Sequence, residues 1–133
     1  EKSEKTTEVD SIPLADLVRK YDITLIKMDV EGYESEILYK KIPNELKKIF
    51  MEFHTALLGK EKVEELLRYF EEEGFNVKYL VEDLPIRLYP FWNILKKLGL
   101  IKKFTYVKRD LKPTECIDLL KKGRTVKYLF LER

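Results

Sequence analysis

The stretch ITLIKMDVEGYE, residues 23–34, decides the fold class of this chain. Residues 23–30 form a nearly continuous apolar run with β-branched members, which is typical of a strand buried on both faces, as in a parallel sheet. Gly32 then allows a tight turn, and residues 33–41 have the pattern of a helix. We therefore expect a strand that ends at acidic residues and is followed directly by a helix.

Strands and helices alternate along the rest of the chain. Helical periodicity predicts helices at 11–21, 33–41, 60–74 and 114–123. Apolar runs predict further strands at 47–54, 75–81 and 125–132. Residues 83–113 are expected to be irregular. This order predicts an α/β chain with a mostly parallel sheet, in which the last two strands could pair antiparallel, since they need no crossover helix of the usual kind.

Composition limits the class of protein. The chain has 133 residues, of which 44% are hydrophobic, so we expect a single domain, 1–133, with a core of its own. Although 38% of the residues are charged, the net charge is +2, and the overall charge therefore predicts neither a nucleic acid nor a membrane partner. The single cysteine, Cys116, excludes an intrachain disulfide and favours a reducing cytoplasm. We expect no secretion signal and no membrane-spanning segment.

Ionisable side chains follow the first two predicted strands at their carboxyl ends, where open α/β sheets bind ligands. The first strand ends at Asp29 and Glu31, and the second ends at Glu52 and His54. Alternate residues of an extended strand point to the same side, so each pair is expected to share a direction. If the strands are neighbours, three carboxylates and the only histidine meet at one crevice. Such a crevice could bind a hydroxyl group, an amine, or a divalent cation held by Asp29, Glu52 and His54.

Each of these residues also has a structural interpretation. Asp29 and Glu31 precede a helix, where its dipole favours acids, and Glu34 fits a solvated surface acid. Glu52 could pair with a nearby lysine, and His54 also fits a surface or core position without chemistry. For Asp29, which follows a buried strand, we favour the functional interpretation.

Residues 9–75 resemble the C-terminal half of the FkbM-type family of S-adenosylmethionine-dependent methyltransferases. The segments concerned are SIPLADLV, ITLIKMDVEGYESEIL and KKIFMEFH. The matching motif residues are Lys27, Asp29, Val30, Glu31, Gly32, Glu34, Glu52 and His54. The sequence departs from the family at Ala15, where an aspartate is expected; Asp16 follows it.

The resemblance implies part of a Rossmann-like sheet, mostly parallel with an antiparallel final strand, and helices on both faces. It also implies S-adenosylmethionine as cofactor, but the five glycines are scattered and form no glycine-rich cofactor loop. We therefore expect a C-terminal fragment, inactive alone, that needs a missing N-terminal half or a second copy at the exposed edge of its first strand. The alternative is a noncatalytic interaction module that binds protein or RNA through this edge or through residues 86–112.

The resemblance further implies transfer of a methyl group to a hydroxyl of a small molecule or glycan. The expected roles are catalysis by Asp29, Glu31 and His54, cofactor contacts by Asp29 and Gly32, and acceptor contacts by Glu52, Tyr89 and Trp92. A divalent metal is a further possibility. Residues 84–113 are expected to be an insert or lid, and eight basic residues lie within 86–112. This segment also fits an amphipathic helix packed on the sheet, or peripheral contact with an anionic membrane or RNA.

Overall fold

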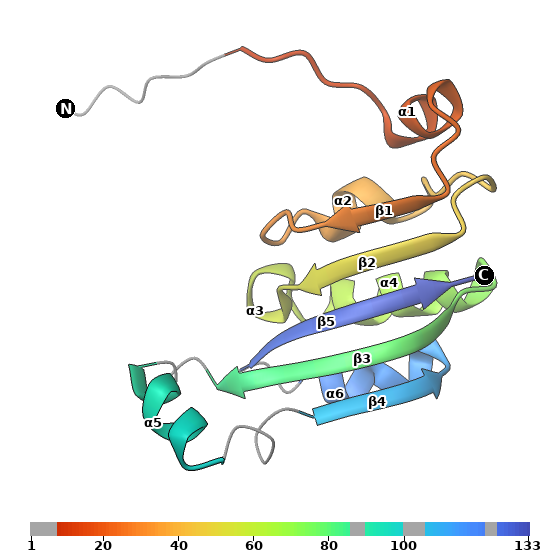
Figure 1. The fold of residues 1–133 in the computed structure, drawn as a ribbon. Helices are drawn as coiled ribbons and strands as arrows, with labels where there is room; N and C mark the ends of the chain where they lie inside the picture. Colours follow the sequence, from red (N-terminus) through yellow and green to blue (C-terminus); the bar gives the residue numbers. More distant parts are fainter. Residues whose placement is uncertain (1–7, 86–89, 100–105, 122–124) are drawn as a thin grey trace.

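The computed structural model describes residues 8–85, 90–99, 106–121 and 125–133 (Figure 1). They form an α/β fold with one five-stranded sheet, in the order β1-β2-β5-β3-β4. The strands are β1 (Leu25–Met28), β2 (Lys48–Phe53), β3 (Asn76–Pro85), β4 (Tyr106–Leu111) and β5 (Thr125–Glu132).

The sheet is mixed, and the prediction that it is mostly parallel is wrong. Only β1 and β2 pair in parallel, with Met28 opposite Met51, in the described sheet. The pairs β2–β5, β5–β3 and β3–β4 are antiparallel. The first three strands run in one direction, but β5 lies between β2 and β3 and runs the opposite way, so these two strands never become parallel neighbours (Figure 1). The predicted antiparallel final strand is confirmed.

The helices lie mainly on one face of the sheet. They are α1 (Leu14–Lys20), α2 (Glu34–Leu38), α3 (Thr55–Leu58), α4 (Lys60–Glu72), α5 (Trp92–Lys97) and α6 (Ile117–Lys121), with a 3-10 turn at Pro113–Cys116. Helix α4 contacts α2, α3 and α6, and α2, α4 and α6 lie behind the sheet in Figure 1. The expectation of helices on both faces is therefore not met by these described helices.

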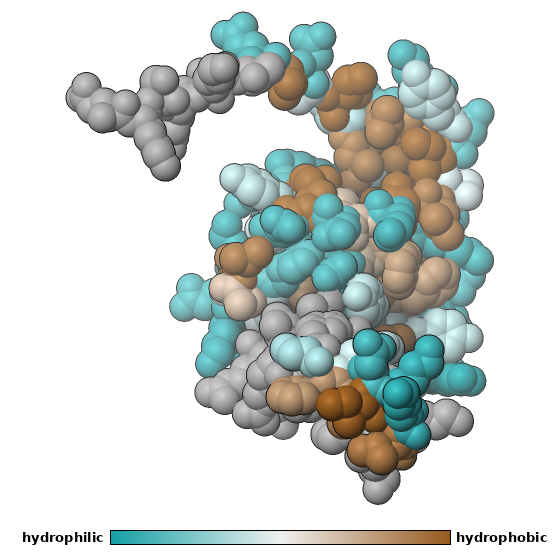
Figure 2. Space-filling view, turned by 60° about the vertical axis from the view of Figure 1, so that its left-hand side comes forward, coloured by the Kyte–Doolittle hydropathy of each residue, from teal (hydrophilic) through white to brown (hydrophobic). Residues whose placement is uncertain are grey.

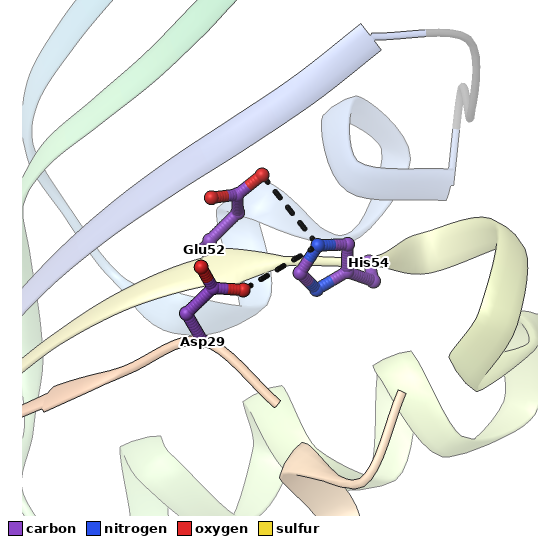
Figure 3. A group of neighbouring side chains, drawn as sticks. All are labelled: Asp29, Glu52 and His54. Atoms are coloured by element: carbon purple, nitrogen blue, oxygen red, sulfur yellow. Dashed lines mark ion pairs between the residues drawn. The ribbon is translucent and has the colours of Figure 1, made fainter. Parts of the chain in front are cut away.

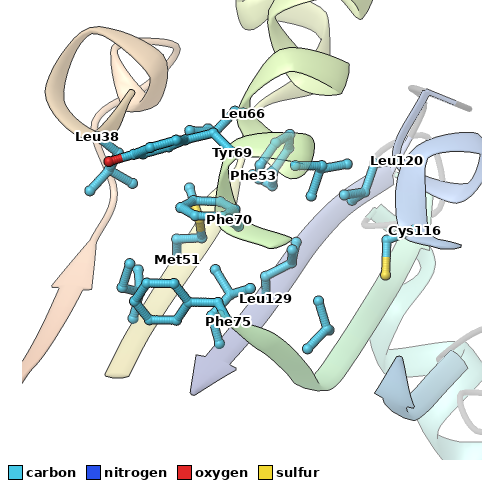
Figure 4. Packing of buried hydrophobic residues seen from close by; sticks show 14 of the residues in the cluster. Leu38, Met51, Phe53, Leu66, Tyr69, Phe70, Phe75, Cys116, Leu120 and Leu129 are labelled. Carbon is cyan, nitrogen blue, oxygen red and sulfur yellow. The ribbon is translucent and has the colours of Figure 1, made fainter. Parts of the chain in front are cut away.

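The hydrophobic core lies between this helical layer and the sheet (Figure 4). Alternate residues of β2 face it because successive side chains of a strand point to opposite sides. The buried strand side chains include Ile49, Met51, Phe53, Leu129 and Leu131. They pack beneath the apolar stripe of α4, which is formed by Val63, Leu66, Leu67 and Phe70. The core thus fixes which residues of β2 face inward and which face outward.

The opposite face of the sheet carries a row of aromatic side chains. The ring of Phe50 stacks on Tyr128, with centroids 6.2 Å apart, and also contacts Phe130. Phe130 in turn contacts Tyr79. These rings are half-buried or exposed. Glu52 lies two residues after Phe50 on β2, so its side chain belongs to this outer face, which positions it for the site described below.

Two local predictions are wrong. Strand β1 is not buried on both faces; it is a four-residue edge strand on which Leu25 and Lys27 are exposed. Residues 83–113 are not wholly irregular, because they contain the end of β3, α5 and β4. Strand β4 forms by pairing with β3, a long-range contact that its mixed polar sequence does not reveal.

Helix α5 presents its large apolar side chains to solvent. The exposed residues on and next to it are Phe91, Trp92, Ile94 and Leu98. Figure 2 shows hydrophobic and hydrophilic groups side by side at the lower end of the molecule, where α5 lies. This arrangement differs from the amphipathic helix packed on the sheet that was one expectation for the segment. Among the described helices, none is both long and apolar enough to cross a membrane.

Candidate functional site

The turn after β1 sets the direction of the acidic residues. The strand ends at Met28, and the chain then passes through Glu31, with φ of 46°, and Gly32, with φ of 98°, before α2 begins. A Cβ atom at Gly32 would lie 2.8 Å from the Cβ of Leu57, so the absence of a side chain lets this turn pack against α3. The turn therefore holds Asp29 beside the end of β2.

The end of β2 positions the only histidine of the chain. Phe53 is buried in the core, so its neighbours Glu52 and His54 point away from the core. The next residue, Thr55, is buried, and its hydroxyl donates a hydrogen bond of 2.8 Å to the carbonyl oxygen of Leu120. This bond ties the segment that follows His54 to α6 and limits the positions that the imidazole can take.

Three side chains converge where the parallel strands end (Figure 3). The Nε2 atom of His54 lies 3.5 Å from Oε1 of Glu52 and 3.8 Å from Oδ1 of Asp29. One ligand atom from each residue can be chosen so that all three lie within 4.8 Å of one another. The side chain of Asp29 is 51% exposed, whereas those of Glu52 and His54 are 24% and 18% exposed. The cluster is therefore open to solvent on the side of Asp29.

A buried carboxylate lies behind the imidazole. The Nδ1 atom of His54 is 2.9 Å from Oε1 of Glu34, whose side chain has no exposed surface. An ionised Glu34 would accept a hydrogen bond from the Nδ1–H tautomer of the imidazole. A neutral His54 then carries its lone pair on Nε2, directed at the two other acids. The second oxygen of Glu34, Oε2, has no hydrogen-bond partner in the described part of the chain.

The structure brings Asp29 and Glu52 together with His54 as predicted, but the prediction that Glu31 is the third carboxylate of this group is wrong. Glu31 is exposed, and its positive φ ends the strand alternation on which the prediction for it depended. Glu34 takes its place, and its interpretation as a solvated acid is wrong. Its burial has a signal in the sequence, because Glu34 and the apolar Leu38 are four residues apart and share one face of α2.

Of the two predicted acceptor contacts outside the strand ends, the structure describes only Trp92. Trp92 lies at the start of α5 and is 37% exposed. Tyr89 lies outside the described residues. Their roles, like the catalytic and cofactor roles of the other residues, stay predictions.

A hollow of about 520 Å³ lies elsewhere, between helix α2 and the start of α1 with the segment before it. Its lining is mostly apolar and includes Ile12, Leu14 and Ile37, with Glu36 and Lys41 as charged members. None of the converging residues lines it. Chemistry therefore points to the solvent-accessible group at the strand ends, where three carboxylates surround one imidazole. Such a group can accept a proton, bind a hydroxyl or amine, or hold a cation.

One family of known proteins matches the part of the chain that carries these residues. The family described as the methyltransferase FkbM domain matches residues 1–77, which is 77 of 133 residues. The matched segment includes Asp29, Glu52 and His54 and also the buried Glu34. Neither a curated protein nor a solved structure matches the chain.

Proposed function

The chain belongs to the FkbM methyltransferase family, and on this premise we propose that it serves the transfer of a methyl group from S-adenosylmethionine to a hydroxyl oxygen of a small molecule or glycan. The observation that carries the proposal is the position of His54 between buried Glu34 and the solvent-facing acids Asp29 and Glu52. The solvent-accessible space beside Asp29, Glu52 and His54 is the proposed site of the acceptor hydroxyl.

The arrangement suits removal of a proton from the acceptor. Methylation of a hydroxyl by a sulfonium breaks the carbon–sulfur bond of the methyl group and forms a new carbon–oxygen bond. The sulfur leaves as a neutral thioether with the electron pair of the broken bond, and the hydroxyl proton must be removed. With Glu34 as acceptor of the Nδ1–H of a neutral His54, the Nε2 lone pair is free to take that proton. Asp29 and Glu52 lie on the same side of the ring and can accept a hydrogen bond from the incoming hydroxyl. Both acids would also stabilise the imidazolium that forms.

The methyl donor supplies an electrophilic methyl group, but the described residues do not fit its nucleoside. Gly32, in the turn after β1, leaves no cradle, because the space beside it is filled by Leu57. The other described glycines, Gly59, Gly74 and Gly99, are far apart in the sequence. The proposal therefore includes a further segment, in the same or a partner polypeptide, that binds the nucleoside. In this proposal the described residues bind the methyl acceptor only.

The experiment is a methyl-transfer assay on the native protein with labelled S-adenosylmethionine and a panel of sugars and small alcohols. His54→Ala and Asp29→Asn are compared with Glu65→Gln, an exposed acid on α4. We expect losses of about 10²-fold or more for the first two variants, the usual contribution of a general base and its partners, and no change for the control. Absence of transfer to every acceptor, or a wild-type rate in His54→Ala, would reject the proposal.

A further inference from the structure

We propose that Asp29, Glu52 and His54 bind a divalent transition-metal cation through one carboxylate oxygen each and the imidazole Nε2. Such cations bind imidazole nitrogen and carboxylate oxygen at about 2.0–2.2 Å, which puts neighbouring ligand atoms roughly 3.0–3.5 Å apart. The Nε2 atom of His54 is 3.5 Å from the Glu52 oxygen and 3.8 Å from the Asp29 oxygen. Both separations exceed a direct hydrogen bond and need only a small adjustment to match a shared cation.

Buried Glu34 supplies a second, independent observation. Histidines that bind metals generally donate their other ring N–H to a carboxylate or carbonyl, which fixes the ring and directs the free nitrogen at the metal. Glu34 does this at 2.9 Å from Nδ1, with no exposed surface and with Oε2 lacking a partner among the described residues. Burial of an ionised carboxylate whose partner is a single imidazole costs free energy unless positive charge lies nearby.

The charge balance points the same way. Asp29, Glu34 and Glu52 surround one imidazole, and in the described part of the chain their ion pairs are all with His54. Three carboxylates therefore face at most one positive charge. A divalent cation between Asp29, Glu52 and His54 would compensate this excess without displacing the hydrogen bond to Glu34.

The ligand types select the class of metal. One imidazole and two carboxylates suit Zn²⁺, Mn²⁺ or Fe²⁺ better than Ca²⁺ or Mg²⁺, which prefer oxygen ligands alone. Three protein ligands leave coordination positions free, and the side of Asp29 is open to solvent. An acceptor hydroxyl could bind there and lose its proton more readily. This role for the cation rests on the proposed function. The cation would replace His54 as the group that activates the hydroxyl, because binding the cation and accepting the proton both need the Nε2 lone pair of His54.

The test begins with binding alone. The native protein is freed of metal with a chelator and titrated with Mn²⁺ and Zn²⁺ by calorimetry, with Mg²⁺ and Ca²⁺ as comparisons. We expect one saturable site that prefers the transition metals. His54→Ala, Asp29→Asn and Glu52→Gln should each weaken binding at least about tenfold, and Glu34→Gln, which alters only the second ring contact, should weaken it by about 10- to 100-fold. Glu65→Gln should bind as wild type.

Urea unfolding of each variant separates lost binding from lost folding. If wild type shows no saturable binding of either metal, or if folded ligand variants bind as tightly as wild type, the metal site is rejected. Methyl transfer that persists in chelator would also reject a role for the cation, while leaving the proposed function intact. Conversely, metal binding to these three residues in a protein without methyl-transfer activity would support the site and reject the proposed function.

Discussion

The Nδ1 atom of His54 lies 2.9 Å from Oε1 of Glu34, and this contact joins the end of β2 to the first turn of α2. One partner is wholly buried and the other is 18% exposed. The contact thus links the buried part of the site, at Glu34, to the part that is open to solvent, at Asp29. Glu34 is a positioning residue: it touches the imidazole and sets which ring nitrogen faces Asp29 and Glu52.

Replacing Glu34 should change the tautomer of His54. In wild type we expect the neutral ring to carry its proton on Nδ1, because Glu34 accepts it. Glu34→Ala removes that acceptor, so the Nε2–H form should gain population and face the two remaining acids. Nitrogen NMR of the imidazole measures this directly, and the signals need no assignment because the chain has one histidine. Identical tautomer populations in a folded Glu34→Ala variant would contradict the positioning role.

Gly32→Ala should destabilise the fold more than Gly74→Ala. Both glycines have positive φ, 98° and 79°, which strains an alanine by about 1–3 kcal/mol. Only at Gly32 would the new Cβ meet a neighbour, the Cβ of Leu57 at 2.8 Å, whereas nothing lies within 4 Å at Gly74. Overpacking should add about 1–3 kcal/mol to the loss in free energy of unfolding for Gly32→Ala. Urea unfolding measures both variants, and equal losses would show that the contact with Leu57 relaxes freely.

The Cys116 thiol should be protected from alkylation in the folded protein. Burial, followed by the charge of Glu115, raises its pKa to about 11, although Lys108 acts in the opposite direction. Only the thiolate reacts, so at pH 8 the reactive fraction should be about a hundredfold below that of an ordinary thiol, and burial should slow labelling further. Labelling with and without concentrated urea gives the comparison, and Cys116 is the only cysteine. Similar rates in both conditions would mean that the packing around α6 opens easily.

The contact between Glu64 and Lys121 should make part of the stability depend on pH. Hydrogen bonds from Lys121 and from Arg68 lower the pKa of Glu64 to about 2. Since the folded pKa lies below the unfolded value, this contribution is present above about pH 4.3 and is lost as the pH falls towards 2.

Glu64→Gln should therefore lower the urea midpoint at pH 6, and its difference from wild type should shrink between pH 4.5 and 2. The pair is solvent-accessible, so salt should reduce the difference as well. Glu65→Gln, an exposed acid of the same helix, is the control and should show little difference at either pH. A difference for Glu64→Gln that stays constant over this pH range would contradict the assignment.

Local sequence patterns predicted those elements whose own residues favour the structure that they adopt in the fold. Strand β5 (Thr125–Glu132) was expected at 125–132, and the apolar stripe of Val63, Leu66, Leu67 and Phe70 located α4. Strand β4 was missed because its order comes from pairing with β3 rather than from its own composition. The prediction of a mostly parallel sheet failed for the same reason, since the position of β5 between β2 and β3 is a long-range property.

For the site, the sequence by itself determined that Asp29, Glu52 and His54 stand at the carboxyl ends of two apolar strands, because a period of two assigns each residue to a side. Tertiary structure decided the rest. It brought β1 and β2 into parallel contact, turned Glu31 outward through a positive φ, and buried Glu34 against the imidazole. The turn at Gly32 also packs against Leu57, and such contacts between segments 25 residues apart are encoded by no local pattern.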